Sequence, residues 1–359
     1  MPDWTWTITG PAGSTELTRA RDRKLAFRRR ESAEASFAIN GRHTQAAFIE
    51  ELISDVTVRR DGRKIFRGRV GQTSDDVDAK SHTMTVGVGD YRALLDARIL
   101  YPTDTLTYPF SDAGVIAGDV LDTVQTRDGG DLGITPGVGI PAGTIAADVE
   151  FAPGQSAAAA IDAVAGLDPV DGGFDWEVDA DLALNVYPAG RGQTRTLILE
   201  YGGSVASFRR VVDPRTYANV VRLSGATTSH LVQATDLDER PEGRWESQVG
   251  DQDLVDPQQV ISQAARVLDE RQTIRPSWAV TLRKGWWQGP DHLWLGDTAR
   301  LRVLSGRLDV AVDARVEEVG ITLDGKGSES VELTLDLSFA AVARRIAAVD
   351  RRLRDLERV

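Results

Sequence analysis

The sequence predicts a mainly β protein: two small β-barrel domains, a central α+β module between them, and a C-terminal helix with a heptad pattern. Short alternating apolar and polar stretches, bounded by Gly, Asp and Pro, recur in the first ninety residues and again after residue 276. Three helical patterns lie between these regions, and the last twenty-one residues repeat apolar side chains at intervals of three and four. The predicted boundaries are 1–96, 97–205, 206–337 and 338–359.

Composition narrows the class of protein. The chain has 359 residues, of which 41% are hydrophobic and 27% charged, which is typical of a globular protein with a sizeable core. It has no cysteine, which excludes disulfides, thiolate metal sites and cysteine nucleophiles. The net charge of −12 argues against stable binding of nucleic acid. We expect no export signal and no membrane span, since no basic and apolar leader and no run of eighteen apolar residues occurs.

The first predicted domain is a set of short strands. Trp4, Trp6 and Ile8 alternate with threonines, and a turn is expected at Asp61-Gly62. A helical turn beginning at Tyr91 closes the domain. The run RARDRKLAFRRRES is rich in arginine, and we interpret it as a strand with one solvated, charged face.

The central module combines helices with a hairpin. A helix capped by Ser111 or Asp112 is followed by a Gly- and Pro-rich loop, and the segment SAAAAIDAVAGL predicts a second helix. A hairpin is expected from Phe174–Val178 and Leu182–Tyr187.

The third region returns to strands. A polar loop is expected over Asp236–Asp256, followed by a helix with Asp256 as its N-cap, Pro257 at its first position and Gln259 at its third. Four or five strands then run to Leu337, separated by turns at Gly296-Asp297, Ser305-Gly306 and Asp324-Gly325.

The C-terminal segment predicts a parallel coiled coil. Its seam consists of Phe339, Val342, Ile346, Val349, Leu353 and Leu356. Between parallel chains, Arg345 faces Asp350 and Arg352 faces Glu357, with opposite charges in both pairs. Valine at two d positions disfavours a dimer, so a homotrimer is the first choice. The alternative is a surface helix that caps its own domain.

Two groups of residues are candidates for chemistry or binding. Asp175, Glu177, Asp179 and Asp181 could bind calcium or act as acid and base in glycoside cleavage. We favour a solvated strand face, because the glycine turn and bidentate glutamate of a calcium loop are missing. The tryptophans of KGWWQGPDHLWLGD, namely Trp286, Trp287 and Trp294, are either buried or, if exposed, a protein contact. No metal-spaced histidines, nucleophile elbow, phosphate loop or dinucleotide motif is present, so no enzyme activity, metal or cofactor is expected.

The order of these segments resembles the tail-hub or minor tail proteins of long-tailed bacteriophages. The segments that carry the resemblance are VGVGDYRALLDARIL, GFDWEVDADLALNVYP, YGGSVASFRRVVDPRTYANVVRLSGA, LWLGDTARLRV and the final helix. The resemblance implies a structural hub at the virion tail tip, made and assembled in the host cytoplasm. It also implies a trimeric ring that adapts a six-fold tail tube to a three-fold tip and lines the DNA exit path. Its partners would be the distal tail protein ring, the tape measure protein and a central fibre or other tip proteins.

Two alternatives belong to other classes of protein. A tail-associated cell-wall hydrolase would use the acidic hairpin, and a glycan-binding adhesin would use the tryptophan loop.

Overall fold

The computed structural model describes residues 2–100, 106–143, 145–146, 149–151, 153–167, 173–188, 190–212, 214–250, 257–273, 276–325 and 327–337. The chain divides into two compact units. The main unit comprises residues 1–208 and 279–359, and the small unit is Arg209–Trp278. The heptad segment, with all the predicted seam residues and flanking charges, lies outside the described residues.

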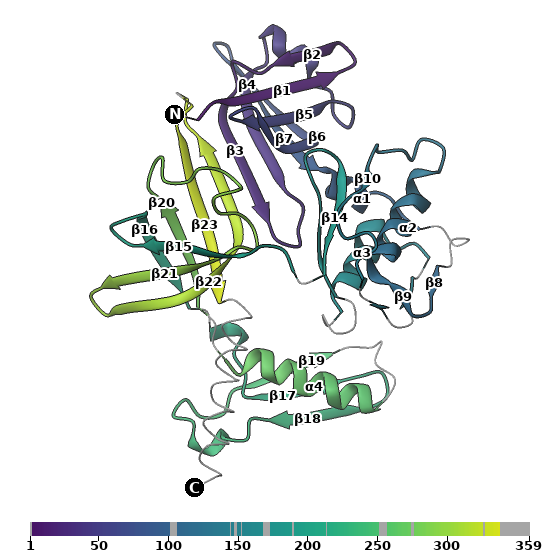
Figure 1. Ribbon diagram of the computed structural model, residues 1–359, viewed down its shortest axis with the longest axis vertical. Helices are drawn as coiled ribbons and strands as arrows, with labels where there is room; N and C mark the ends of the chain where they lie inside the picture. Colours follow the sequence, from purple (N-terminus) through teal and green to yellow (C-terminus); the bar gives the residue numbers. More distant parts are fainter. Residues whose placement is uncertain are drawn as a thin grey trace. The chain divides into compact units, whose positions relative to one another are not determined.

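The N-terminal strands of the main unit form hairpins followed by a short helix (Figure 1). The elements are β1 (Trp4–Gly10), β2 (Gly13–Glu16), β3 (Arg21–Arg28), β4 (Glu34–Asn40), the 3-10 helix η1 (Thr44–Phe48), β5 (Asp55–Arg60), β6 (Arg63–Val77), β7 (His82–Asp90) and α1 (Tyr91–Asp96). Trp6 and Ile8 are buried on one face of β1, as their alternation predicts. The expected turn at Asp61-Gly62 joins β5 to β6, and both residues have positive φ. Asp90 caps α1 by accepting a hydrogen bond from the Ala93 N–H.

The α+β insert follows. Its elements are β8 (Thr107–Tyr108), β9 (Ser111–Asp112), α2 (Ala113–Gln125), β10 (Thr135–Pro136), β11 (Ile145–Ala146), β12 (Val149–Glu150), α3 (Ala157–Ala165), β13 (Asp175–Val178) and β14 (Ala183–Tyr187). Asp112 caps α2 and Ser156 caps α3. The predicted hairpin is confirmed as the antiparallel pair β13 and β14.

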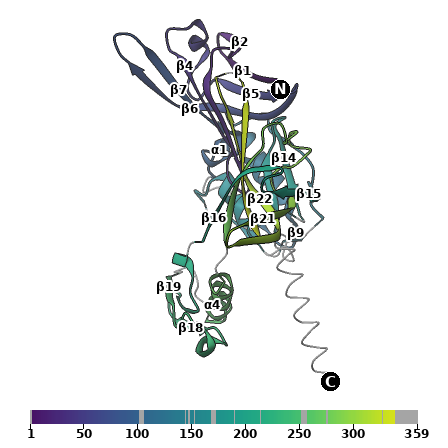
Figure 2. The ribbon, with the colours of Figure 1, turned by 90° about the vertical axis from the view of Figure 1, so that its left-hand side faces the viewer.

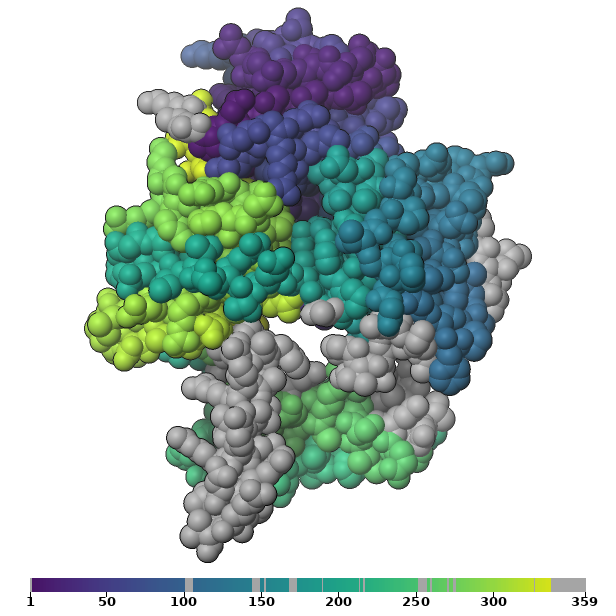
Figure 3. Space-filling view, in the orientation of Figure 1, coloured from purple at the N-terminus to yellow at the C-terminus, as the bar shows by residue number. Residues whose placement is uncertain are grey.

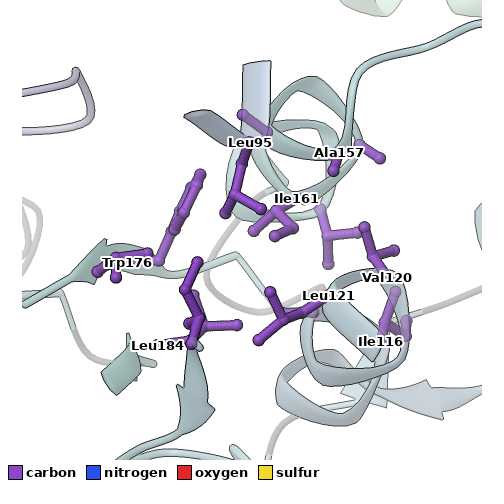
Figure 4. Packing of buried hydrophobic residues seen from close by; sticks show 14 of the residues in the cluster. Leu95, Ile116, Val120, Leu121, Ala157, Ile161, Trp176 and Leu184 are labelled. Carbon is purple, nitrogen blue, oxygen red and sulfur yellow. The ribbon is translucent and has the colours of Figure 1, made fainter. Parts of the chain in front are cut away.

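The insert has its own apolar core, in which α2 and α3 pack against the β13–β14 hairpin and α1 (Figure 4). Figure 4 shows Leu95, Ile116, Val120, Leu121, Ala157, Ile161, Trp176 and Leu184 converging from these elements. The core fixes the hairpin relative to α1, and α1 continues directly from β7.

The C-terminal strands complete the main unit. They are β15 (Thr194–Glu200), β16 (Val205–Val211), β20 (Ser277–Leu282), β21 (Thr298–Ser305), β22 (Leu308–Leu323) and β23 (Glu329–Leu337), of which β16 and β20 cross the unit boundary. Four strands therefore lie between residue 276 and Leu337, within the expected number. The long β22 lies between β23 and β3 in the sheet, and Figure 2 shows β22 extending toward the N-terminal strands.

The prediction was two small β-barrel domains, and the described residues form no closed barrel. Thirteen described strands form one sheet with the path β16-β20-β23-β22-β3-β4-β7-β6-β5-β1-β2, and β15 pairs with β21, which pairs with β22. The joint between the two halves is β22, whose residues Glu318 to Leu323 pair antiparallel with β3. Figure 3 shows the purple N-terminal strands, the blue-to-teal insert and the yellow-green C-terminal strands on one face. A pairing between residues so far apart along the chain leaves no local trace in the sequence.

The small unit is an independent α/β layer. Its sheet has the order β18 (Ser229–Gln233), β17 (Val220–Ser224), β19 (Glu246–Gly250), and α4 (Pro257–Arg271) packs on it. Two 3-10 turns, η3 (Pro214–Thr216) and η4 (Leu237–Glu239), also occur. The helix begins at Pro257, as expected, while its predicted N-cap Asp256 lies outside the described residues. The loop predicted over Asp236–Asp256 contains β19, whose single large apolar residue, Val249, was too weak a signal.

No helix of the described part of the chain is both long and apolar enough to cross a membrane.

Candidate functional site

A cleft of about 750 Å³ in the main unit is lined by the end of β3 and the residues after it, the start of β6, the β13–β14 hairpin and the loop before β21. It contains many of the charged residues that the sequence analysis singled out. The basic residues that line it are Arg28, Arg29, Arg30, Arg63, Lys64, Arg67, Arg92, Arg191 and Arg195. The acidic residues that line it are Glu31, Asp90, Asp175, Glu177, Asp179, Asp181, Asp291 and Asp297.

Asp175 lies at the centre of an ion-pair cluster, although the solvated-face interpretation placed it in water. It is only 2% exposed. Its Oδ1 accepts hydrogen bonds from Arg29 Nη1 at 2.8 Å and Arg30 Nε at 2.7 Å. Its Oδ2 accepts from the Arg191 backbone N–H at 2.9 Å and from Arg315 Nη2 at 3.1 Å. The solvated-face interpretation is therefore wrong for Asp175.

The cluster joins three parts of the main unit. Arg29 and Arg30 follow β3, Asp175 begins β13, and Arg315 lies in β22. Glu317, also in β22, accepts from Arg29 Nε at 2.6 Å. Asp175 thus holds the insert against the joint between the two halves of the sheet. The arginine run after β3 is correspondingly not simply solvated, because Arg29 is mostly buried in these pairs.

The surroundings of Asp175 oppose acid–base chemistry. Burial alone would raise its pKa, but the Arg30 hydrogen bond, the Arg191 N–H and the charges of Arg29 and Arg30 outweigh burial and lower the pKa below its usual value. A general acid needs a raised pKa. All its acceptor positions are also occupied by protein donors, so a substrate proton or a metal has no free lone pair to approach.

The other acids of the hairpin are held differently. Glu177 pairs with Arg191 at 2.6 Å and accepts a hydrogen bond from the Tyr187 hydroxyl. Asp179 organises the turn by accepting from the backbone N–H groups of Asp181 and Ala183. Asp181 is exposed and pairs with Lys64 at 2.5 Å. The four acids therefore do not share one face as a ligand set, and the described residues contain no group of three or more acidic or histidine side chains that could hold a metal ion.

The segment after β14 and the loop before β21 form one wall of the cleft, and a close backbone contact between Gly192 and Gly296 holds them together. Gly192 has φ of +96°, and a Cβ there would lie 2.0 Å from the Gly296 carbonyl carbon. This contact brings Asp297 to the Gln193 N–H and to Arg195 Nε, each at 2.8 Å.

The tryptophan loop lies mostly inside the main unit. Trp287 is buried, donates its indole N–H to the Leu293 carbonyl and lies under the Arg60 guanidinium at 4.8 Å. It stacks on Trp294, which in turn contacts Phe27. Trp286 and Trp294 are half-buried, and Trp286 packs on His292. A partner contact at Trp286 or Trp294 stays a prediction.

Sequence reasoning missed the partners of Asp175. Arg29 and Arg30 were noticed only as members of a charged run, while Arg191, Arg315 and Glu317 carried no signal. One signal was available: the acidic strand that begins at Asp175 and the arginine run that ends β3 have opposite charges, which could have suggested that they pair.

Comparison with known proteins places this geometry in a known fold. Neither a family model nor a curated protein matches the chain. A 43 kDa tail protein of prophage MuSo2 from Shewanella oneidensis has a TM-score of 0.66 at 14% identity, over 93% of this chain and 98% of that one. A tail protein from Neisseria meningitidis MC58 has a TM-score of 0.64 at 11% identity, over 94% and 97%. Prophage tail protein gp18 from Listeria monocytogenes has a TM-score of 0.56 at 13% identity, over 98% and 99%. The predicted resemblance is confirmed at the level of the fold: over more than 90% of its length, this chain has the fold of phage tail proteins.

Proposed function

We propose that this chain is a structural protein of a bacteriophage tail, and that it forms a trimeric hub at the tail tip. The observation that carries the proposal is the end-to-end likeness of fold, which covers 93% of this chain and 98% of the MuSo2 tail protein. A likeness of fold over nearly the whole length of both compared chains favours a shared structural role.

The proposal includes no catalytic role. The acids that could have supported a cell-wall hydrolase are occupied in ion pairs and turn hydrogen bonds. The loop that could have supported a glycan-binding adhesin has its central tryptophan, Trp287, buried.

The hub would adapt a six-fold tail tube to a three-fold tip and central fibre, with the distal tail protein ring and the tape measure protein as neighbours. A DNA path through the ring needs walls without excess positive charge, because free arginines would hold phosphates. In the β3 region each of three arginines has a carboxylate partner, since Arg28 pairs with Glu318, Arg29 with Glu317, and Arg30 with Asp175, so the excess positive charge there is small.

The trimer is proposed to depend on the heptad seam from Phe339 to Leu356. Light scattering at matched protein concentrations tests this, with the mass of three chains as the expected result. Arg352→Glu places two acids opposite each other in each of three equivalent pairs and should weaken the trimer, each pair contributing about 0.2–1 kcal/mol. The double variant Arg352→Glu, Glu357→Arg should recover most of the loss, most clearly at low salt. A wild-type protein that is monomeric at all concentrations would exclude the seam.

The position in the virion is tested separately by electron microscopy of particles labelled with an antibody to this chain. Label at the tail tip supports the hub. Label along the tail shaft, or none on intact and on disrupted particles, contradicts it.

A further inference from the structure

The ion-pair cluster beside the cleft contains more positive than negative charge. Three guanidinium groups, those of Arg29, Arg30 and Arg315, meet two carboxylates, those of Asp175 and Glu317. The nearby pair of Arg191 and Glu177 is neutral. Burial lowers the pKa of Arg315, and the neighbouring charge of Arg29 lowers it further, as expected where cations are crowded. An additional anion would relieve this crowding.

Arg30 is the member of the cluster that can reach such an anion. It lines the cleft, and its side chain is 53% exposed. Its Nε donates to Asp175, and within the described residues its side chain has no second hydrogen bond or ion pair. The remaining N–H groups of the guanidinium are therefore available to a ligand.

The backbone holds Arg30 in place. Its φ is +66°, in the left-handed region that few residues with a Cβ adopt. The strained conformation is secured by Arg92, whose Nη2 donates to the Arg30 carbonyl at 2.6 Å and to Asp162 at 2.7 Å. Arg92 itself is buried. Strain of this kind persists only where the surroundings hold it, and it often occurs where a side chain contacts a ligand.

We propose that Arg30 forms an anion subsite in this cleft, and that its ligand is the carboxylate of an aspartate or glutamate side chain on a partner protein segment. A guanidinium edge matches a planar carboxylate. The cluster has one more positive than negative charge, which a singly charged carboxylate balances, whereas a doubly charged phosphate would leave it with excess negative charge. The volume of about 750 Å³ is within the range of sites that hold a short segment of a ligand.

One neighbouring acid weakens the subsite. Glu31 follows Arg30 in the chain, is well exposed and lies 3.8 Å from Arg28. Its charge opposes an incoming carboxylate, so its removal should strengthen binding.

The experiment titrates the full chain with the peptide acetyl-Gly-Glu-Gly-amide and follows arginine Nε–Hε signals by NMR. The Arg30 signal is identified by its absence in Arg30→Gln. The expected result is a saturable shift of this signal with the glutamate peptide and none with acetyl-Gly-Gln-Gly-amide. Equal shifts with both peptides, or no shift with either, overturn the proposal. Tighter binding of inorganic phosphate than of the glutamate peptide overturns the carboxylate assignment.

Two further variants make the test independent of whether Arg30→Gln folds. Glu31→Gln should tighten binding of the glutamate peptide by about 1.4- to 5-fold, the range expected for one exposed charge. Arg42→Gln, at an exposed arginine outside the cleft, should leave the affinity unchanged. Weaker or unchanged binding in Glu31→Gln contradicts the proposal.

Discussion

The two ends of the β13–β14 hairpin carry aspartates that look alike in the sequence and lie in opposite surroundings. Asp175 begins the hairpin, is 2% exposed and accepts hydrogen bonds from three arginines and one backbone N–H. The side chain of Asp181, in the turn, is 72% exposed and has one lysine partner. The difference arises from what packs on each end: β22 and the residues after β3 cover the first, while solvent covers the second. Alternation along a strand therefore assigns a face but not the burial of that face.

The largest effect is expected at the buried end. Asp175→Asn removes the negative charge, which leaves the mostly buried guanidinium groups of Arg29 and Arg315 with Glu317 alone and Arg30 without its carboxylate partner. We expect a loss of about 3–5 kcal/mol in the free energy of unfolding, as for other broken buried ion pairs. Urea denaturation at pH 7 measures it, with Asp181→Asn as the matched control, which should lose less than about 1 kcal/mol. Equal losses in the two variants would contradict the burial argument.

The same comparison applies to adjacent tryptophans. Trp287 is buried under Arg60 and donates to the Leu293 carbonyl, whereas Trp286 is half-buried. Trp287→Phe loses the indole hydrogen bond and much of the cation–π contact, so we expect a loss of about 1–3 kcal/mol. Trp286→Phe should stay within about 0.5 kcal/mol of wild type. Thermal and urea unfolding of both variants check this, and a larger loss for Trp286→Phe would show that the two roles are reversed.

A second comparison concerns two buried carboxylates with pKa shifts of opposite sign. Asp90 is buried with only two backbone N–H donors, those of Ala33 and Ala93, and burial raises its pKa from 3.8 to about 6. Between these values the folded protein binds the proton that the unfolded chain has lost. The contribution of Asp90 to stability therefore falls as pH rises from about 4 through 6. Asp175 behaves oppositely: its lowered pKa gives stability that is lost only as pH falls below 3.8.

The pH prediction is tested by the difference in unfolding free energy between wild type and Asp90→Asn at pH 4, 5, 6 and 7. The uncharged variant lacks this titration, so wild type should lose stability relative to it by on the order of 2–3 kcal/mol across the range. A difference that stays constant with pH would show that Asp90 titrates at its ordinary pKa.

The sequence predicted well those features that depend on near neighbours. A cap residue signalled the helix after Asp112, and proline signalled the helix at Pro257. The alanine-rich segment predicted the helix after Ser156, and the turn predicted the β13–β14 hairpin. Two features were not predictable: the pairing of β22 with β3 and the ion-pair cluster around Asp175. In both, the residues that meet lie about 140 to 300 positions apart in the chain, so no local pattern marks their contact. For the same reason, the sequence predicted two separate barrels and did not show that their strands join in one sheet.

The smallest effect is expected at the exposed end of the hairpin, where Lys64 and Asp181 lie 2.5 Å apart. The lysine side chain is one-third exposed and the aspartate mostly exposed, so water screens the pair. A double-mutant cycle with Lys64→Gln, Asp181→Asn and the combined variant should give a coupling energy of about 0.2–1 kcal/mol. The turn itself should persist in Asp181→Asn, because Asp179 holds it through the Asp181 and Ala183 N–H groups. Raising the salt concentration to about 1 M shortens the screening length to about 3 Å and should remove most of the coupling. A coupling that exceeds about 2 kcal/mol, or that is insensitive to salt, would mean that this end of the hairpin is shielded from water like the end at Asp175.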